Sequence, residues 1–299
     1  MSLTGVLVAV AGGIFGTAIG ALPAFIFVGL LVIVGVAVQA AGGGGDFLSL
    51  IPLGALFGPH VGGWAAGVAG AAYAAKKGKL ESGRDTSTAL MGLNSPDVLL
   101  IGGLFGIVGY VLNWLLSQVG FAWTDTVALS VVLSAIIARL AFGKTGVFGK
   151  VAEGTKRFAP DDATKWVPWM SDPAQRIIIG LGAGLMSAYM ALAIGPDNGG
   201  VVLGFGISAA SLVFLQYGTK VPVTHHITLV AAVAAAGSGS LIWGAAFGIL
   251  AALVGEYMAC LFNIHGDTHI DPPAATIAAL TSLSLAVQAL GIYTLITLP

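Results

Sequence analysis

The sequence predicts an all-α integral membrane protein with about nine transmembrane helices, two short re-entrant or half-helical segments and an inverted-topology repeat. Three observations lead to this prediction. Hydrophobic residues make up 57% of the 299 residues and charged residues only 8%, against about a quarter in soluble globular proteins. Apolar runs of helix length recur along the chain, and its first and last parts share one order of features.

Composition also excludes several classes of protein. The net charge of −1 leaves no overall basic surface for nucleic acid. The single cysteine, Cys260, excludes an internal disulfide, and the 45 glycines fit closely packed membrane helices. No Lys or Arg precedes the first apolar run, so we expect a retained helix there and not a cleaved signal peptide.

Nine apolar runs have the length of a spanning helix, which needs about 20 residues. They are residues 4–21, 24–41, 60–76, 97–117, 124–143, 176–195, 201–217, 240–262 and 274–297. Two shorter apolar stretches, 47–58 and 223–236, are bounded by Gly, Pro or charge. We predict that these two are the re-entrant or half-helical segments.

An internal duplication is indicated by features that recur in the same order. A helix with a glycine and a glutamine ten positions apart is followed by a short apolar segment, a glycine-rich break and a tryptophan, Trp64 or Trp243. A long helix, a polar loop and a helix that begins with proline come next. We predict copies at 1–119 and 176–299, joined over 120–175 by a linker helix and an amphipathic cytoplasmic loop.

Loop charges predict the orientation of the copies. The polar loop 76–84 is basic, its counterpart 263–271 is acidic without Lys or Arg, and the central loop 144–176 is basic. Because basic loops stay in the cytoplasm, the first two loops are expected on opposite sides of the inner (plasma) membrane. The copies would then be antiparallel, with the N-terminus outside and the C-terminus in the cytoplasm.

The two breaks, FGPHVGGW and AGSGSLIW, are the predicted binding centre, because broken helices mark the sites of inverted-repeat transporters. The alternative is that both are ordinary loops between full helices. The residues expected to contact a substrate are Gly58, His60, Gly62, Gly237 and Gly239.

Ionisable side chains within apolar sequence are the next candidates, since they are costly in a membrane. Asp46, His225, His226 and Glu256 are predicted to bind coupling protons or monovalent cations. Asp46 and His225 are 179 positions apart, like the two tryptophans. The alternative is that they are helix caps or lie at the level of the lipid headgroups.

The acidic loop carries His265, Asp267, His269 and Asp271 at every second position, which in an extended chain places them on one side. Such a set can bind a divalent metal, although structural zinc sites usually have wider spacing. We favour a polar loop that gates the entrance and caps the next helix, and we predict no metal site.

One local resemblance occurs in the same region. The stretch THIDPPAATIAAL, residues 268–280, resembles the proline-pair signature of small bacterial HPP membrane proteins. Asp271 stands where that signature has histidine. The resemblance covers about a dozen residues and implies no function for the whole chain.

Together these features predict a secondary active transporter that moves a small ion or polar solute by alternating access. Helix N-termini at the breaks would favour an anionic group. No catalytic constellation is present, so we predict a protein that is not an enzyme, needs no cofactor, resides in the lipid bilayer and forms a homo-oligomer. The alternatives are a passive channel, or a non-transporting subunit or membrane enzyme whose loop 144–176 docks a partner.

Overall fold

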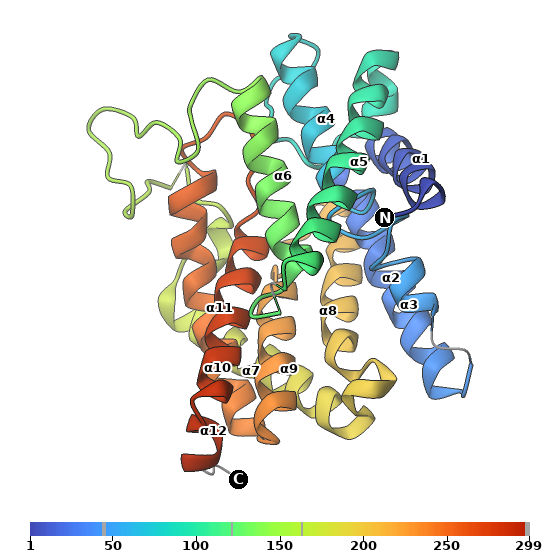
Figure 1. Cartoon of the computed structure of the whole chain (residues 1–299). Coiled ribbons are helices and arrows are strands. Elements are labelled where there is room, and N and C mark those ends of the chain that lie inside the picture. The colour runs from blue at the N-terminus through green and yellow to red at the C-terminus, as the bar shows by residue number, and fades with distance from the viewer. Residues whose placement is uncertain (44–45, 121, 163, 297–299) are drawn as a thin grey trace.

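A computed structural model describes residues 1–43, 46–120, 122–162 and 164–296 (Figure 1). Within these ranges the chain is all-helical, with 69% of residues in helices and no strand. The helices of the first half are α1 (Leu3–Ile19), α2 (Ala21–Ala40), α3 (Phe47–Leu50), α4 (Ala65–Lys76), α5 (Pro96–Gln118) and α6 (Thr126–Phe142). Those of the second half are α7 (Pro173–Ile194), α8 (Gly200–Ser211), α9 (His225–Ser238), α10 (Leu241–Met258), α11 (Pro272–Ala289) and α12 (Ile292–Leu295).

Each of the nine predicted apolar runs contains a helix. Among the described residues, five helical stretches are long and apolar enough to cross a membrane. They are Ala21–Ala40, Pro96–Gln118, Pro173–Ile194, Gly200–Tyr217 and Leu241–Asn263. Helices α1, α6 and α9 are also apolar but shorter, between 10 and 17 residues.

Helices α2 and α8 cross at glycines, which allow close approach of two backbones. A Cβ atom on Gly29 would lie 2.7 Å from the carbonyl oxygen of Gly206, and one on Gly206 would lie 3.2 Å from that of Gly29. Further along, Gln39 of α2 reaches Gly199 at the start of α8. The two helices are therefore antiparallel, and they lie side by side in Figure 1.

Helices α6 and α11 form a second antiparallel pair. The Thr124 hydroxyl, just before α6, donates to the carbonyl of Ala278 in the middle of α11 at 2.9 Å. Near the other end of α6, the buried Arg139 guanidinium donates to the side chain and carbonyl of Thr268, which precedes α11. The start of each helix thus lies beside the body of the other.

The first predicted break is non-helical backbone in the protein interior. Residues 51–64 separate α3 from α4, and residues 57–64 are buried. Backbone hydrogen bonds within the segment satisfy part of it, including Gly58 N–H to the Gly54 carbonyl at 2.9 Å. The predicted half-helical stretch 47–58 is helical only over Phe47–Leu50.

The second predicted break is an ordinary tight turn, so its interpretation as a partner of the first is wrong. The predicted half-helical segment is the continuous helix α9, which ends at Gly239 with φ 71°. Ser240 then caps α10 by accepting from the Ile242 N–H. Gly237 lies beside Gln288, while Gly239 is exposed, so neither faces the first break.

The loops predicted on opposite sides of the membrane are in contact, which corrects the orientation argument. Gly83 forms an isolated bridge with Thr268, and its carbonyl accepts from His269 N–H at 3.2 Å. Arg84 donates to the carbonyl of Ile264 at 3.0 Å. The predicted orientation depended on residues 223–236 being a re-entrant segment. These residues instead belong to helix α9, which packs antiparallel to α10, so the pair returns the chain to the same end.

Candidate functional site

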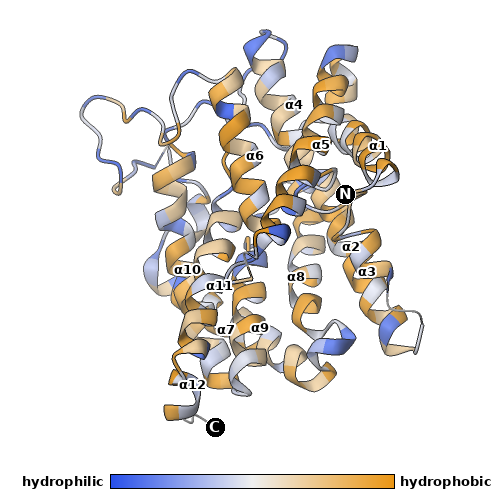
Figure 2. Cartoon of the chain, in the orientation of Figure 1, coloured by the Kyte–Doolittle hydropathy of each residue, from blue (hydrophilic) through white to orange (hydrophobic). Residues whose placement is uncertain are grey.

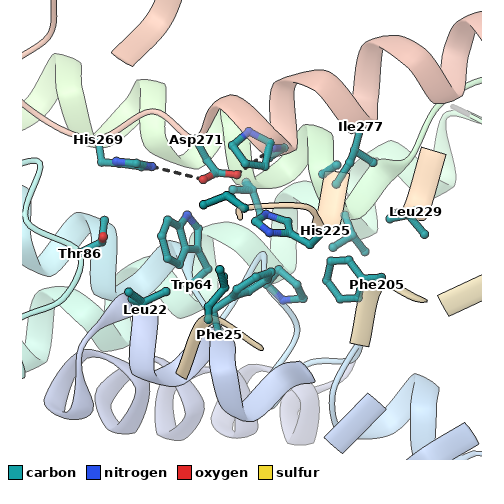
Figure 3. Close-up of a pocket in the computed structure, with 18 of the residues that line it drawn as sticks. Leu22, Phe25, Trp64, Thr86, Phe205, His225, Leu229, His269, Asp271 and Ile277 are labelled. Carbon is teal, nitrogen blue, oxygen red and sulfur yellow. Dashed lines mark hydrogen bonds and ion pairs between the residues drawn. The ribbon is translucent and has the colours of Figure 1, made fainter. Parts of the chain in front are cut away.

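A cavity of about 330 Å³ lies between the two halves of the chain. Helices α2, α6, α8, α9 and α11 line it together with the 51–64 segment (Figure 3). The loop 144–176, called the central segment below, contributes further lining residues. Most of the lining is apolar. The polar lining groups are Thr86, Ser87, Asp125, His225, His269 and Asp271, with the indoles of Trp64, Trp166 and Trp169.

Aromatic rings from separate elements form one wall of this cavity. Phe25 of α2 contacts Trp64 and Phe205 edge-on, with ring centroids 5.6 Å apart in both pairs. It also lies 4.7 Å from the ring of His225. In Figure 3 these side chains surround the same space. The 51–64 segment thus has a clear local role, because its non-helical path brings Trp64 to this wall.

Next to this wall, His269 and Asp271 form a buried pair, and the ring centroid of His269 lies 5.4 Å from that of Trp64 (Figure 3). His269 Nε2 lies 3.2 Å from Asp271 Oδ1. The other carboxylate oxygen accepts from Ala274 N–H at 2.7 Å and so caps α11. Asp125 has the same relation to α6, where its carboxylate accepts from Ala128 N–H at 2.8 Å. Two helix-capping carboxyl groups therefore face one cavity.

Two polar atoms at the cavity are buried and have no hydrogen-bond partner among the described residues. They are the indole Nε1 of Trp64 and the ring Nδ1 of His225. The two residues are 9% and 6% exposed, respectively. Unsatisfied buried polar groups are rare in folded proteins and call for an explanation. A ligand in the cavity that hydrogen-bonds to them would supply one.

A second hollow of about 400 Å³ adjoins the cavity and is more open and more polar. Thr86, Trp166 and His269 line both, so they separate the two spaces. Arg84 and Lys165 line only the outer hollow. This hollow is bordered by the contacting loops and adjoins the cavity, and it is called the vestibule below.

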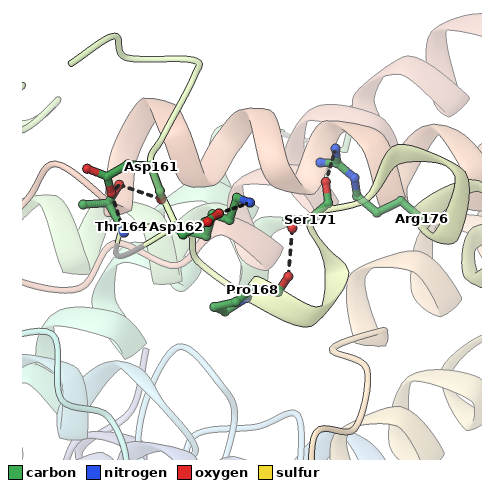
Figure 4. Close-up of polar contacts among 7 residues, drawn as sticks. Asp161, Asp162, Thr164, Pro168, Ser171 and Arg176 are labelled. Carbon is green, nitrogen blue, oxygen red and sulfur yellow. Dashed lines mark hydrogen bonds and ion pairs between the residues drawn. The ribbon is translucent and has the colours of Figure 1, made fainter. Parts of the chain in front are cut away.

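Contacts within the central segment hold Lys165 at the vestibule. Its ammonium group lies 2.6 Å from the carboxylate of Asp162, and this hydrogen bond lowers the pKa of Asp162 (Figure 4). The Ser171 hydroxyl donates to the Pro168 carbonyl, and Arg176 donates to the carbonyl of Ser171. The predicted amphipathic loop is thus mostly irregular, and Trp166 and Trp169 turn toward the cavity.

Five of the predicted residues gather in or beside the cavity. His225, His269 and Asp271 line it. His60 and His226 are buried just behind it, each against a glycine: the His60 carbonyl packs on Gly109 and the His226 ring packs on Gly255.

The remaining predicted substrate and ion residues lie elsewhere. Asp46 is exposed just before α3, whereas His225 is buried, despite their shared spacing from the tryptophans. Glu256 pairs with Arg176 at 3.6 Å. Gly58 and Gly62 are packing positions, the first against the His60 ring and the second against the backbone of Gly12. Gly237 and Gly239 belong to the turn described above.

The alternating residues of the acidic loop do not converge on a common point. His265 bonds to the carbonyl of Arg157 at 3.0 Å, and Asp267 accepts from Lys144 and Thr145. Only His269 and Asp271 pair with each other. In the part of the chain that the structure describes, no group of three or more His, Cys, Asp or Glu side chains could hold a metal ion.

Sequence reasoning missed Asp125, Phe25 and the position of Trp64 in the cavity wall. A signal for Asp125 was present, because Thr-Asp followed by an apolar helix resembles Ile-Asp at 270–271. The aromatic residues gave no signal, since a phenylalanine within an apolar run is most often a core residue.

Comparison with known proteins gives one result. No curated protein and no solved structure shows significant similarity to the chain. A family described as being of unknown function, DUF7973, matches residues 1–164 and also residues 153–297. The chain belongs to this family.

Proposed function

We propose that the chain is a membrane transporter for a small solute, built from two inverted repeats of five crossings, with the cavity as its binding site. The first repeat would comprise α1 to α6, with α3, the 51–64 segment and α4 together forming one crossing. The second would comprise α7 to α11. A residence in the membrane, the repeat and the cavity are supported by separate observations.

Residence in the membrane is supported by the outer surface of the helices. Large apolar side chains there are exposed, among them Leu7 (61%), Phe15 (55%), Leu100 (66%) and Ile178 (70%). Figure 2 shows hydrophobic colour along the helices and hydrophilic colour mainly in loops and at helix ends. Such a surface is unfavourable in water and suits the hydrocarbon of a bilayer.

The repeat is supported by the pairing of helices. Helix α1 packs on α5 as α7 packs on α10, and α4 packs on α6 as α9 packs on α11. Helices α5 and α6 contact each other as α10 and α11 do. This correspondence places α6 in the first repeat, where the sequence interpretation made it a linker, and it matches α4 with α9 instead of α10.

The sequence supports the same correspondence without a gap. Residues 102–128 align with 248–274 at a constant separation of 146 positions. The matched pairs are Gly102 with Gly248, Gly109 with Gly255, Gly120 with Gly266, Asp125 with Asp271, and Ala128 with Ala274. Gly109 and Gly255 also have matched surroundings, since each packs on a buried histidine. The two ranges of the family match, 1–164 and 153–297, each hold one proposed repeat.

Inversion is supported by the two helix pairs described above. An axis in the membrane plane brings equivalent helices together in opposite directions. In the proposed correspondence, α2 is equivalent to α8 and α6 to α11. Both pairs are in contact and antiparallel.

The observation that carries the function is the symmetric lining of the cavity. Asp125 and Asp271 both line it, as do Val131 and Ile277, which keep the same separation of 146 positions. The cavity therefore lies where the proposed repeats meet. Transporters with inverted repeats bind their substrates at this interface, and rocking of one repeat against the other then exposes the site to either side.

Flux measurements on reconstituted protein test this proposal. Proteoliposomes are to be screened with ammonium, carboxylate and neutral solutes small enough for the cavity. We expect saturable uptake of at least one class. Asp271→Asn, which retains a capping side chain, should lower that uptake about tenfold or more, the effect of losing one charge-assisted contact. Asp172→Asn is the matched control, because Asp172 caps α7 by the same bond but does not line the cavity.

Three results would contradict the proposal. Unsaturable electrical conductance far above about 10³ ions per second, beyond typical turnover rates, would indicate a passive channel. Uptake equal to wild type in Asp271→Asn and Trp64→Phe would show that solute does not pass through this cavity. Absence of any flux, with a stoichiometric partner that copurifies, would favour a non-transporting subunit.

A further inference from the structure

We propose that the cavity binds a small organic cation, an ammonium compound with an apolar body and an acceptor oxygen near the ammonium group. This inference rests on the proposed binding role of the cavity and names the class of solute. It reverses the expectation of an anionic substrate, which depended on uncapped helix N-termini at the two breaks.

The charges that line the cavity favour a positive ligand. Asp125 and Asp271 both line the cavity, whereas no Lys or Arg is among its described lining residues. Their carboxylates cap α6 and α11, so the helix N-termini at this cavity carry their own negative groups. Arg84 and Lys165 line the adjoining vestibule and are engaged there by the carbonyl of Ile264 and by Asp162. His269 contacts one oxygen of Asp271 at 3.2 Å.

The aromatic wall provides a second attraction for the same charge. The faces of Phe, Tyr and Trp rings attract cations, most strongly where water is excluded. Phe25, Trp64 and Phe205 form a continuous set of edge-to-face contacts along the cavity, and Trp166 and Trp169 line it from the central segment. An ammonium group bound near Asp271 would meet that carboxylate and the aromatic rings of this wall in the same cavity (Figure 3).

The unpartnered polar atoms define the remaining part of the ligand. Trp64 Nε1–H can only donate, so it needs an acceptor, and an ammonium group alone supplies none. A hydroxyl or carbonyl oxygen on the ligand would satisfy it. His225 Nδ1, also buried without a partner, can accept from the ammonium or from that hydroxyl. The rest of the lining is apolar and can accommodate a hydrocarbon group of the ligand.

Binding to the full chain in detergent tests the class with a series of probes of nearly equal shape. The cation is 2-amino-1-phenylethanol, its neutral analogue is 1-phenyl-1,2-ethanediol, and its anionic analogue is mandelate. Calorimetry should show the cation binding at least about tenfold more tightly than the diol, the difference that one charge-assisted contact brings. Mandelate should bind more weakly than the diol.

Variants assign these differences to residues. Asp271→Asn and Asp125→Asn should each lower the affinity for the cation about tenfold and leave the affinity for the diol nearly unchanged. Asp172→Asn should change neither affinity. Trp64→Phe keeps the aromatic face and removes the donor. It should bring the affinity of 2-amino-1-phenylethanol down to that of phenethylamine, which lacks the hydroxyl. Thermal unfolding of each variant without probe shows whether it is folded.

The inference is overturned if the diol or mandelate binds as tightly as the cation. It is also overturned if the folded wild-type chain binds none of the probes. These outcomes are distinct from failure of the transport proposal. Cation binding without flux in vesicles would retain the ligand class and remove the transporter. Saturable flux of an anion or neutral solute would retain the transporter and remove the class.

Discussion

Asp267 joins two loops that are far apart in the sequence. Its carboxylate accepts from the Lys144 N–H at 2.6 Å and from the Thr145 hydroxyl at 2.7 Å. Burial alone would raise the pKa of Asp267, but these hydrogen bonds and the charge of Arg139 outweigh it and lower the pKa below the usual value. The group therefore stabilises the folded state when it is ionised.

This arrangement predicts a pH dependence. Because the folded pKa is depressed, the stabilisation is fully present above about pH 4, the ordinary Asp value, and is lost as the pH falls through the folded pKa. Asp267→Asn should remove about 1 kcal/mol at neutral pH and speed hydrogen exchange at Lys144. Asp161→Asn is the control, since the Asp161 carboxylate bonds among the described residues only to the nearby Thr164. Equal exchange in wild type and Asp267→Asn would contradict the assignment.

Among the residues that line the cavity, the sequence singled out ionisable ones more often than aromatic ones. His225, His269 and Asp271 were found because charged or titratable groups in apolar sequence must have a compensating environment. Asp46 met the same criterion but lies exposed next to a helix end, since a residue between two apolar runs can lie at either the core or the surface. Asp125 was overlooked because its own helix was interpreted as a linker.

Among the elements, helix positions followed from apolar length, but the glycine breaks did not. FGPHVGG is buried non-helical backbone, whereas AGSGS forms a turn with a left-handed Gly239 and a Ser240 cap. Glycine permits both outcomes, and only packing against other helices decides between them. A comparison of the two halves by helix contacts would have matched His60 with His226, a pair that the break pattern concealed.

The glycines at helix contacts yield a prediction for the elements. A Cβ on Gly109 would overlap the carbonyl oxygen of His60, which belongs to rigid backbone. Gly109→Ala should therefore destabilise the protein by about 1–3 kcal/mol through overpacking. Gly182→Ala in α7 is the control, because a Cβ there meets nothing within 4 Å and alanine is favoured over glycine in helices by about 1 kcal/mol. Thermal unfolding in detergent measures both, and equal effects would refute the close contact.

At the scale of the whole molecule, the sequence predicted two related, inverted halves, and the proposed repeat retains that idea with different partners. The loop charges misled in part because a positive charge from another element also lies at the acidic loop, where it lowers the pKa of Asp267. Arg139 from α6 is buried against this loop and donates to the carbonyl of Phe262 as well as to Thr268. A charge count over one loop cannot include an arginine contributed by a distant helix.

The proposed repeat predicts that both chain termini lie on one side of the membrane. Loops 76–84 and 263–271 and the central segment meet at one end, and α11 leads from that end toward the C-terminus at the other (Figure 1). In the proposed topology this end is cytoplasmic, because loop 76–84 and the central segment are rich in Lys and Arg. In a Cys260→Ala background, Glu153→Cys should therefore react with an impermeant maleimide only from the cytoplasmic side. Thr294→Cys should react only from outside, together with Asn198→Cys in the exposed turn before α8. The proposal has five crossings, α7 to α11, between Glu153 and Thr294. Labelling of Glu153→Cys and Thr294→Cys from the same side would show an even number of crossings between them. That result would exclude two repeats of five.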